Sequence, residues 1–113
     1  MKPETKLKVK VLNGLRGIQD SYFEKIQQQT ICGTPDIIGC VPYDCHRCKQ
    51  RFGLFVGMEL KQGNGQPTKL QSFKLEQIHR AGGLALVVNE KNYQQAVSQL
   101  RDLSAGKTWM QPK

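Results

Sequence analysis

The first stretch of the chain carries two overlapping patterns of apolar positions. Leu7, Val9 and Val11 alternate with lysines, which is typical of a strand. Apolar residues also recur at helical spacing, at Leu7, Val11, Leu15 and Ile18. A proline followed by a glutamate at the start suits a first helical turn. We therefore predict a helix over residues 3–15, ended by the glycine at position 14 or by the one at position 17.

Short apolar runs further along the chain predict strands. They cover residues 22–26, 36–41, 54–60 and 84–88. The last run is apolar throughout, as expected for a strand that is covered on both faces. Residues 27–33 are polar and predict a loop, and a polar insert over residues 42–51 separates the second run from the third.

The clearest helix begins after Thr68. The Thr68 hydroxyl can cap free backbone amides, and Gln71, three residues on, completes the pattern of a capping box. Leu75 and Ile78 then fall on one face, and the glycines at positions 82 and 83 end the helix.

A last amphipathic helix over residues 91–103 completes a single domain of 113 residues, in which we find no repeats. Its inward positions are Tyr93, Ala96, Val97, Leu100 and Leu103. From about residue 104 we expect a frayed tail, with Trp109 as the residue that could pin part of it. The order helix, three strands, helix, strand, helix predicts an α/β fold with a mixed central sheet flanked by helices.

The charge of the chain narrows the choice of partner. Lysine and arginine outnumber aspartate and glutamate by 17 to 9, which gives a formal net charge of +8. This excess favours a polyanion, because each neutralised phosphate releases condensed counterions. No apolar run approaches the roughly 20 residues that a bilayer span needs, so we expect no membrane segment. The start also lacks the apolar stretch of a secretory signal, and we expect a cytoplasmic protein with reduced cysteines.

Two short segments carry candidate chemistry. Asp36 stands at the entrance of one expected strand, and Glu59 and Lys61 stand two residues apart near the end of another. Residues two apart on a strand share a face, so Glu59 and Lys61 should project together while Leu60 points into the core. If the strands pair, Asp36 lies beside Glu59, and two carboxylates that close need a cation between them. Oxygen ligands suit Mg²⁺ or Mn²⁺, which can activate a bound water that Lys61 orients.

In this order the motifs resemble the PD-(D/E)XK nuclease superfamily, and within it the VRR-NUC domains, the virus-type replication-repair nucleases. The matching positions are Gly33, Pro35 and Asp36; Glu59, Leu60 and Lys61; Thr68 to Gln71; and Gly82-Gly83 with residues 84–88. Lys25 is similar to the lysine that often precedes the first motif. The likeness spans roughly residues 4–100. It implies a restriction-endonuclease-like core with the element order α-β-β-β-α-β-α.

The resemblance implies a role for each matching residue. Asp36 and Glu59 would bind Mg²⁺, or Mn²⁺ as a substitute, with the Leu60 carbonyl as a further ligand, and Lys61 would be the catalytic lysine. Gln71 would lie at the edge of the active site near the metal-bound water or the scissile phosphate. Its capping role is compatible with this, since a helix N-terminus favours phosphate. Glu4 matches an acid of the first helix that can contact a second metal, although a first-turn glutamate needs no such role.

The chain departs from compact VRR-NUC domains in a basic insert with cysteines and a histidine, at about residues 40–53. Cys45 and Cys48 form a C-x-x-C pair that can supply two thiolates to Zn²⁺. A structural zinc site needs four ligands, so Cys32, Cys40, His46 or a second copy of the chain would have to complete it. The alternative is a reduced hairpin without metal, and the sequence leaves both open.

The expected partner is nucleic acid. Contacts with its backbone are expected from Lys25, Arg47, Lys49, Arg51 and Lys69. Small VRR-NUC proteins come largely from phages and mobile elements, and some cut branched DNA as dimers. The resemblance therefore implies a homodimeric endonuclease for junctions, flaps or other branched DNA. Two alternatives stay open: a non-catalytic nucleic-acid-binding module, with or without zinc, and a nuclease directed at RNA.

Overall fold

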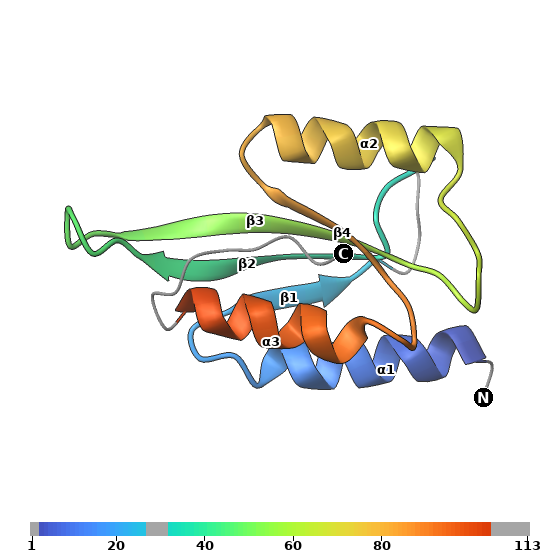
Figure 1. The fold of residues 1–113 in the computed structure, drawn as a ribbon, viewed down its shortest axis with the longest axis horizontal. Coiled ribbons are helices and arrows are strands. Elements are labelled where there is room, and N and C mark those ends of the chain that lie inside the picture. The colour runs from blue at the N-terminus through green and yellow to red at the C-terminus, as the bar shows by residue number, and fades with distance from the viewer. Residues whose placement is uncertain (1–2, 27–31, 105–113) are drawn as a thin grey trace.

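The computed structural model describes residues 3–26 and 32–104. Along this part of the chain the elements are α1 (Pro3–Arg16), β1 (Tyr22–Lys25), β2 (Ile37–Asp44), β3 (Arg51–Leu60), α2 (Lys69–Arg80), β4 (Leu84–Val88) and α3 (Tyr93–Ser104). The predicted order of elements is confirmed (Figure 1). Residues 27–31 of the loop expected over 27–33, and the tail from residue 105, with Trp109, lie outside the described residues.

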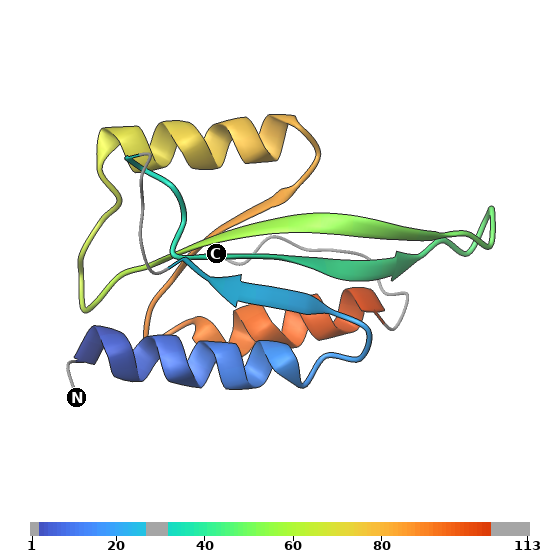
Figure 2. The ribbon, with the colours of Figure 1, turned by 180° about the vertical axis from the view of Figure 1, so that it is seen from behind.

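The strands form one four-stranded sheet in the order β1-β2-β3-β4. The pairs β1–β2 and β2–β3 are antiparallel, whereas β3 and β4 run parallel and are joined through α2. The sheet is therefore mixed, as predicted. α2 lies on one face of this sheet, and α1 and α3 lie side by side on the other (Figures 1 and 2).

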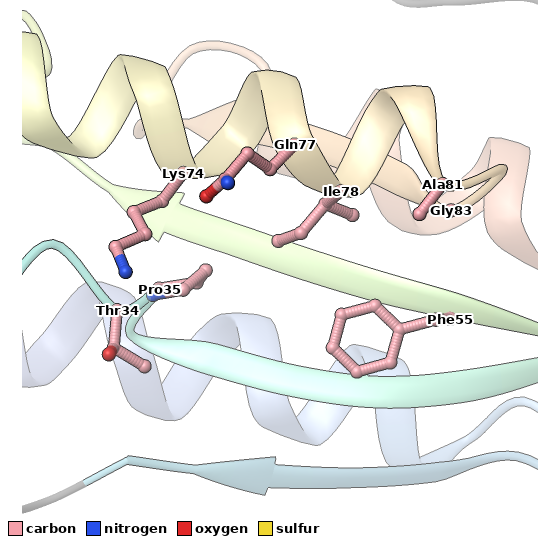
Figure 3. Close-up of a pocket in the computed structure, with 8 residues that line it drawn as sticks. All are labelled: Thr34, Pro35, Phe55, Lys74, Gln77, Ile78, Ala81 and Gly83. Carbon is pink, nitrogen blue, oxygen red and sulfur yellow. The ribbon is translucent and has the colours of Figure 1, made fainter. Parts of the chain in front are cut away.

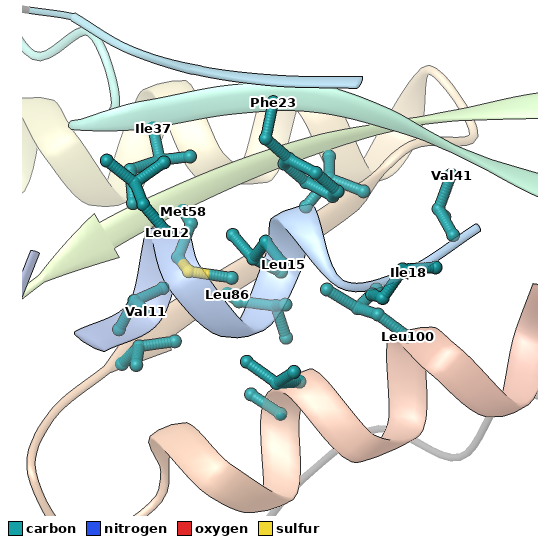
Figure 4. Close-up of a cluster of buried hydrophobic side chains, with 14 of the residues drawn as sticks. Val11, Leu12, Leu15, Ile18, Phe23, Ile37, Val41, Met58, Leu86 and Leu100 are labelled. Atoms are coloured by element: carbon teal, nitrogen blue, oxygen red, sulfur yellow. The ribbon is translucent and has the colours of Figure 1, made fainter. Parts of the chain in front are cut away.

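The main hydrophobic core fills the space between the sheet and the pair α1 and α3. Figure 4 shows side chains of the sheet and of both helices meeting there, among them Leu15 of α1, Met58 of β3 and Leu100 of α3. Each of these three side chains is fully buried. This packing holds α1 in place against the sheet, which matters below because α1 contributes a residue to the candidate site.

The helical interpretation of the first stretch is confirmed. Leu7, Val11 and Leu15 are no more than 1% exposed, whereas Val9 is 42% exposed. The 3.6-residue period therefore describes the buried face, and the strand-like alternation with lysines is incidental. α1 ends at Arg16, directly before the second of the two glycines proposed as its end.

The polar insert proved more regular than the sequence predicted. The expectation that residues 42–51 interrupt the strands was wrong, because β2 continues to Asp44 and β3 begins at Arg51. The ladder between them extends through the Pro42–Gly53 and Asp44–Arg51 pairs. Pro42 has no backbone N–H to donate. It is tolerated here because β1 pairs with β2 only as far as Cys40, so at Pro42 the side of β2 that faces β1 is an edge of the sheet. The insert is thus a long hairpin with a short turn over residues 45–50.

α2 has the predicted start and end. Thr68 Oγ1 accepts a hydrogen bond from the Gln71 backbone N–H at 3.1 Å, and Gln71 Oε1 accepts one from the Thr68 N–H at 2.8 Å. The capping box is therefore confirmed. Gly82, with a φ of 94°, provides the left-handed residue that ends the helix. Among the described residues no helix is long and apolar enough to cross a membrane.

Candidate active site

The three residues singled out from the sequence meet in one small cavity. Asp36, Glu59 and Lys61 line it together with Leu60 and Gln71. The cavity has a volume of about 210 Å³ and lies where β3 ends, β2 begins and α2 begins. A sixth lining residue, Lys8 of α1, completes it from the other side of the sheet.

Asp36 is held in place by the end of β3. Its Oδ2 accepts a hydrogen bond from the Leu60 backbone N–H at 2.8 Å. The β2–β3 register pairs Ile37 with Met58, so the residue before Ile37 stands opposite the residue after Met58. The antiparallel ladder thereby brings Asp36 beside Glu59, although 22 residues separate them.

Glu59 is the one buried charged side chain among the described residues, with only 2% of its surface exposed. Its neighbours Met58 and Leu60 turn toward the core, so the alternation of β3 sends Glu59 to the opposite face. Gln71 Nε2 donates a hydrogen bond to Glu59 Oε1 at 2.9 Å. Glu59 Oε2 is buried and has no hydrogen-bond partner in the described part of the chain.

The electrostatics of the cavity oppose an ionised Glu59. Burial first, and then the negative charge of Asp36, raise the pKa of Glu59 from 4.5 to about 7. Lys61 and Lys8 act in the opposite direction through their positive charges. Two carboxyl groups held this close, with one oxygen unsatisfied, are stable together only when a proton or a cation sits between them.

Lys61 extends the line of β3 by one residue. Its backbone N–H donates to the Val88 carbonyl at 2.9 Å, which prolongs the parallel pairing with β4. Its Nζ lies 3.9 Å from Glu59 Oε1, and its side chain is 21% exposed. The ammonium group therefore faces the same cavity as Glu59, as the strand alternation predicted, and remains reachable from solvent.

Gln71 joins the helix cap to the carboxylate. Its carbonyl oxygen takes part in the capping box, and its amide nitrogen donates to Glu59. α2 can come this close to β3 because Gly57 has no side chain: a Cβ there would lie 2.6 Å from Ile78 Cδ1. The two atoms of the Gln71 amide group thus have different partners: Oε1 takes part in the cap of α2, and Nε2 contacts Glu59.

Lys8 is the site residue that sequence reasoning missed. It is half-buried on α1 and reaches the cavity from a segment more than 25 residues before Asp36. The available signal was its position one helical turn after Glu4, which places both on one face of α1. The Glu4 side chain itself lies outside what the structure describes, so its role stays a prediction.

The donor set fits a hard divalent cation. Asp36 and Glu59 supply carboxylate oxygens, and Glu59 Oε2 accepts no hydrogen bond from the described residues. Among the described residues no group of three His, Cys, Asp or Glu side chains could hold an ion. A cation here would therefore complete its shell with a backbone carbonyl such as that of Leu60, with water or with a phosphate, as Mg²⁺ commonly does.

A larger groove lies on the same face of the sheet but has a different character. It is mostly apolar, about 360 Å³ in volume, and is lined by Thr34, Pro35, Phe55, Lys74, Gln77, Ile78, Ala81 and Gly83. Figure 3 shows Phe55 of β3 and Ile78 of α2 facing each other across it. It contains no acid and no histidine, so the acidic cavity is the better candidate for chemistry.

The basic residues expected to contact nucleic acid lie outside the acidic cavity. Lys25 ends β1, Lys69 begins α2, and Arg47 and Lys49 are exposed in the hairpin turn. Arg51 differs from the others because it is held by two acids. Its guanidinium lies 2.8 Å from Asp44 and 2.9 Å from Asp20, and these contacts raise its pKa and lower that of Asp44.

The cysteines of the proposed zinc set do not converge within one chain. Cys45 and Cys48 lie in the hairpin turn, Cys40 lies within β2, and Cys32 lies before Gly33. Cys40 Sγ packs over Gly53, where a Cβ would approach it to 2.7 Å. All four are free thiols.

Comparison with known proteins bears on the fold. No protein-family model matches the chain, and no curated protein matches it. A solved structure described as a VRR_NUC domain protein superimposes with a TM-score of 0.67. The match covers 90% of this chain and 90% of that chain at 20% sequence identity. The VRR-NUC-type fold predicted from the motifs is thereby confirmed.

Proposed function

We propose that this chain, which has the fold of a VRR_NUC domain, is a metal-dependent endonuclease that hydrolyses phosphodiester bonds in DNA. The observation that carries the proposal is the convergence of Asp36, Glu59 and Lys61 in one cavity, with a buried and unsatisfied Glu59 oxygen. Burying the Glu59 carboxyl group beside a second carboxyl group, and leaving one of its oxygens without a donor, costs stability, and such a cost is typical of functional sites.

The two acids would hold Mg²⁺, or Mn²⁺ as a substitute, with the Leu60 carbonyl as a third protein ligand. When bound, the ion would supply a more acidic water and neutralise charge on a phosphate. Asp36 is suited to this task because the Leu60 N–H fixes one of its oxygens and leaves the other available. Gln71 orients Glu59 by donating to Oε1, which leaves Oε2 as the ligand atom.

Lys61 is the proposed catalytic lysine. Its Nζ lies beside Glu59 and is partly open to solvent, so a phosphate entering the cavity can meet it directly. In that position it orients the attacking water and stabilises negative charge as it develops in the transition state. Lys8 adds a second positive charge from the other wall of the cavity, and its proposed role is to hold a non-bridging phosphate oxygen.

The N-terminus of α2 also favours an anion at this position. The first backbone amides of the helix lie beside Gln71, and helix N-termini attract phosphate. Together with the net charge of +8, this supports a nucleic-acid substrate. Branched or structured DNA and a homodimeric assembly are parts of the proposal that come from the likeness to small VRR-NUC proteins.

A cleavage assay on structured substrates tests the proposal. The panel contains a four-way junction, a flap, a duplex, a single strand and an RNA hairpin, each with Mg²⁺, Mn²⁺, Ca²⁺ or EDTA. We expect branched DNA to be cut with Mg²⁺ or Mn²⁺ and left intact with EDTA. Preferential cutting of the RNA would redirect the proposal to RNA, and binding without cutting under every condition would favour a non-catalytic binding module.

A further inference from the structure

The turn of the β2–β3 hairpin and the acidic cavity lie at opposite ends of β2 and β3. In Figures 1 and 2 the hairpin extends past the ends of the helices, with the turn at its tip. From Arg51 to Glu59 the strand covers about 27 Å at a rise of about 3.4 Å per residue. The chemistry at the tip is therefore independent of the proposed nuclease site.

The tip holds its two cysteines in a specific arrangement. The Cys48 backbone N–H donates to Cys45 Sγ at 3.5 Å, and the Cys48 thiol and the Arg47 backbone lie close enough to that sulfur to lower the pKa of the Cys45 thiol further. The Lys49 N–H donates to the Cys45 carbonyl at 3.0 Å, which closes the turn. Lys49 has a φ of 63°, a left-handed conformation that reverses the chain directly after Cys48.

This arrangement is suited to a metal ion. N–H groups that point at a sulfur stabilise the thiolate, which is the form that binds zinc. The turn places both sulfurs together at the exposed end of the hairpin, and Cys48 is itself exposed. The surrounding charges, Arg47 and Lys49, can offset the two negative charges that four thiolates leave on a zinc ion.

The chain cannot complete such a site alone. Zinc in structural sites takes four ligands, and no third Cys, His, Asp or Glu joins Cys45 and Cys48 among the described residues. Cys40 lies five residues back along β2, about 17 Å away at the rise of a strand. Cys32 precedes the opposite end of the same strand. Neither can reach the tip while the hairpin is formed.

We propose that Cys45 and Cys48 are one half of a tetrahedral zinc site, which a second copy of this chain completes with its own Cys45 and Cys48. A twofold axis through the ion relates the two tips, so each copy contributes the same pair. The projecting hairpin allows this contact, because the helices and the body of each copy stay behind its tip (Figure 1).

A shared site requires one zinc ion per two chains and makes dimerisation depend on the metal. Protein purified under reducing conditions with zinc should contain one zinc per two chains by elemental analysis. It should run as a dimer in light scattering and become monomeric when a strong chelator removes the metal. Replacing zinc with Co²⁺ should give the visible absorption bands of a tetrahedral ion with thiolate ligands.

Matched cysteine variants separate this site from general effects of losing a thiol. Cys45→Ser and Cys48→Ser should each abolish zinc binding and metal-dependent dimerisation. Cys32→Ser and Cys40→Ser should retain both, and Cys32→Ser remains an informative control if Cys40→Ser destabilises β2. Zinc content and oligomeric state report the tip, whereas cleavage by the wild-type protein reports the acidic cavity, so a failure of either proposal is visible without the other.

Three results would overturn the proposal. The first is protein without zinc after purification in its presence. The second is one metal ion per chain in a monomer, which would mean that a single chain completes the site or that two thiolates suffice. The third is a mass two hydrogens lighter than the reduced chain and restored by reductant, which would identify the pair as a disulfide.

Discussion

Gln71 joins the first turn of α2 to the buried acid of β3: its Nε2 donates to Glu59 Oε1 at 2.9 Å while its Oε1 accepts from the Thr68 N–H. One side chain therefore fixes both a helix terminus and the orientation of a proposed metal ligand. The two functions can be separated by substitution, because Thr68 takes part only in the cap.

Replacing Gln71 with Ala should reduce cleavage by about tenfold or more, since Glu59 loses the donor that orients it. Thr68→Ala is the matched control. It should cost about 1 kcal/mol of folding stability through the lost cap, yet leave the cleavage rate of folded protein within a few-fold of wild type. Cleavage rates and urea unfolding of both variants test this. Equal losses of activity in the two would mean that Gln71 acts only through the helix cap.

The raised pKa of Glu59 predicts how stability depends on pH in the absence of metal. Below about pH 4.5 the carboxyl is protonated in both the folded and the unfolded chain. Between that value and about 7 the folded chain holds a proton that the unfolded chain has lost, so the stability contributed by this group declines as the pH rises. Glu59→Gln lacks this decline. In EDTA, the urea midpoint of Glu59→Gln should therefore exceed that of wild type increasingly from pH 5 to pH 7 and by a constant amount above it.

Added Mg²⁺ should stabilise wild type but not Glu59→Gln, and so oppose the difference in stability expected in EDTA. A cation that binds only the folded chain raises its stability, and it can take the place of the proton on the buried acid. At pH 8 we expect millimolar Mg²⁺ to raise the urea midpoint of wild type and to leave that of Glu59→Gln unchanged. A similar rise in both proteins would place the Mg²⁺ elsewhere.

Lys8→Ala tests the wall of the cavity that α1 provides. The variant should lose about tenfold in kcat/KM, because a positive charge facing the phosphate is removed. Its cleavage should also need a higher pH than that of wild type, since Lys8 helps to lower the pKa of Glu59. Lys10→Ala is the control on the same helix: Lys10 pairs with Glu90 at 3.3 Å and does not line the cavity. If the two variants behave alike, Lys8 contributes only general charge.

Arg51 and Lys49 should differ in DNA binding although both belong to the basic hairpin. Lys49→Gln should lower the slope of log affinity against log salt by roughly one, the change expected for one lost phosphate contact. Arg51→Gln should change it less, because Asp44 and Asp20 already neutralise that guanidinium. Fluorescence anisotropy with a labelled junction in Ca²⁺ measures both. A larger loss for Arg51→Gln would show that DNA displaces its acidic partners.

The sequence predicted what depends on local pattern and spacing. The burial of Leu7, Val11 and Leu15, the capping box at Thr68 and the shared face of Glu59 and Lys61 each follow from a period of 3.6 or 2 residues, or from a cap. The length of the hairpin did not follow, because polar residues such as Asp44 and Arg51 belong to strands there and stabilise the pairing through an ion pair across the ladder. Strands are predicted from apolar runs, and this part of the ladder contains no such run.

Lys8 was missed for a different reason. Its place in the cavity depends on how α1 packs against the sheet, and that is a tertiary relationship between segments far apart in the chain. The unsatisfied oxygen of Glu59 likewise could not be inferred from residue order, since it depends on which donors surround the side chain. These two features are the ones that the structure adds to the candidate site.

The most direct measurement is cleavage of a labelled four-way junction with Mg²⁺ by wild type, Asp36→Asn and Lys61→Ala, purified in parallel, with binding measured in Ca²⁺. If Asp36, Glu59 and Lys61 form the active site, wild type alone should nick the junction, EDTA should prevent nicking, and all three proteins should bind. Equal nicking by all three would contradict this assignment, because the cut would then arise outside the cavity formed by Asp36, Glu59 and Lys61. Binding by wild type without any cut on the full panel of DNA and RNA would contradict it as well.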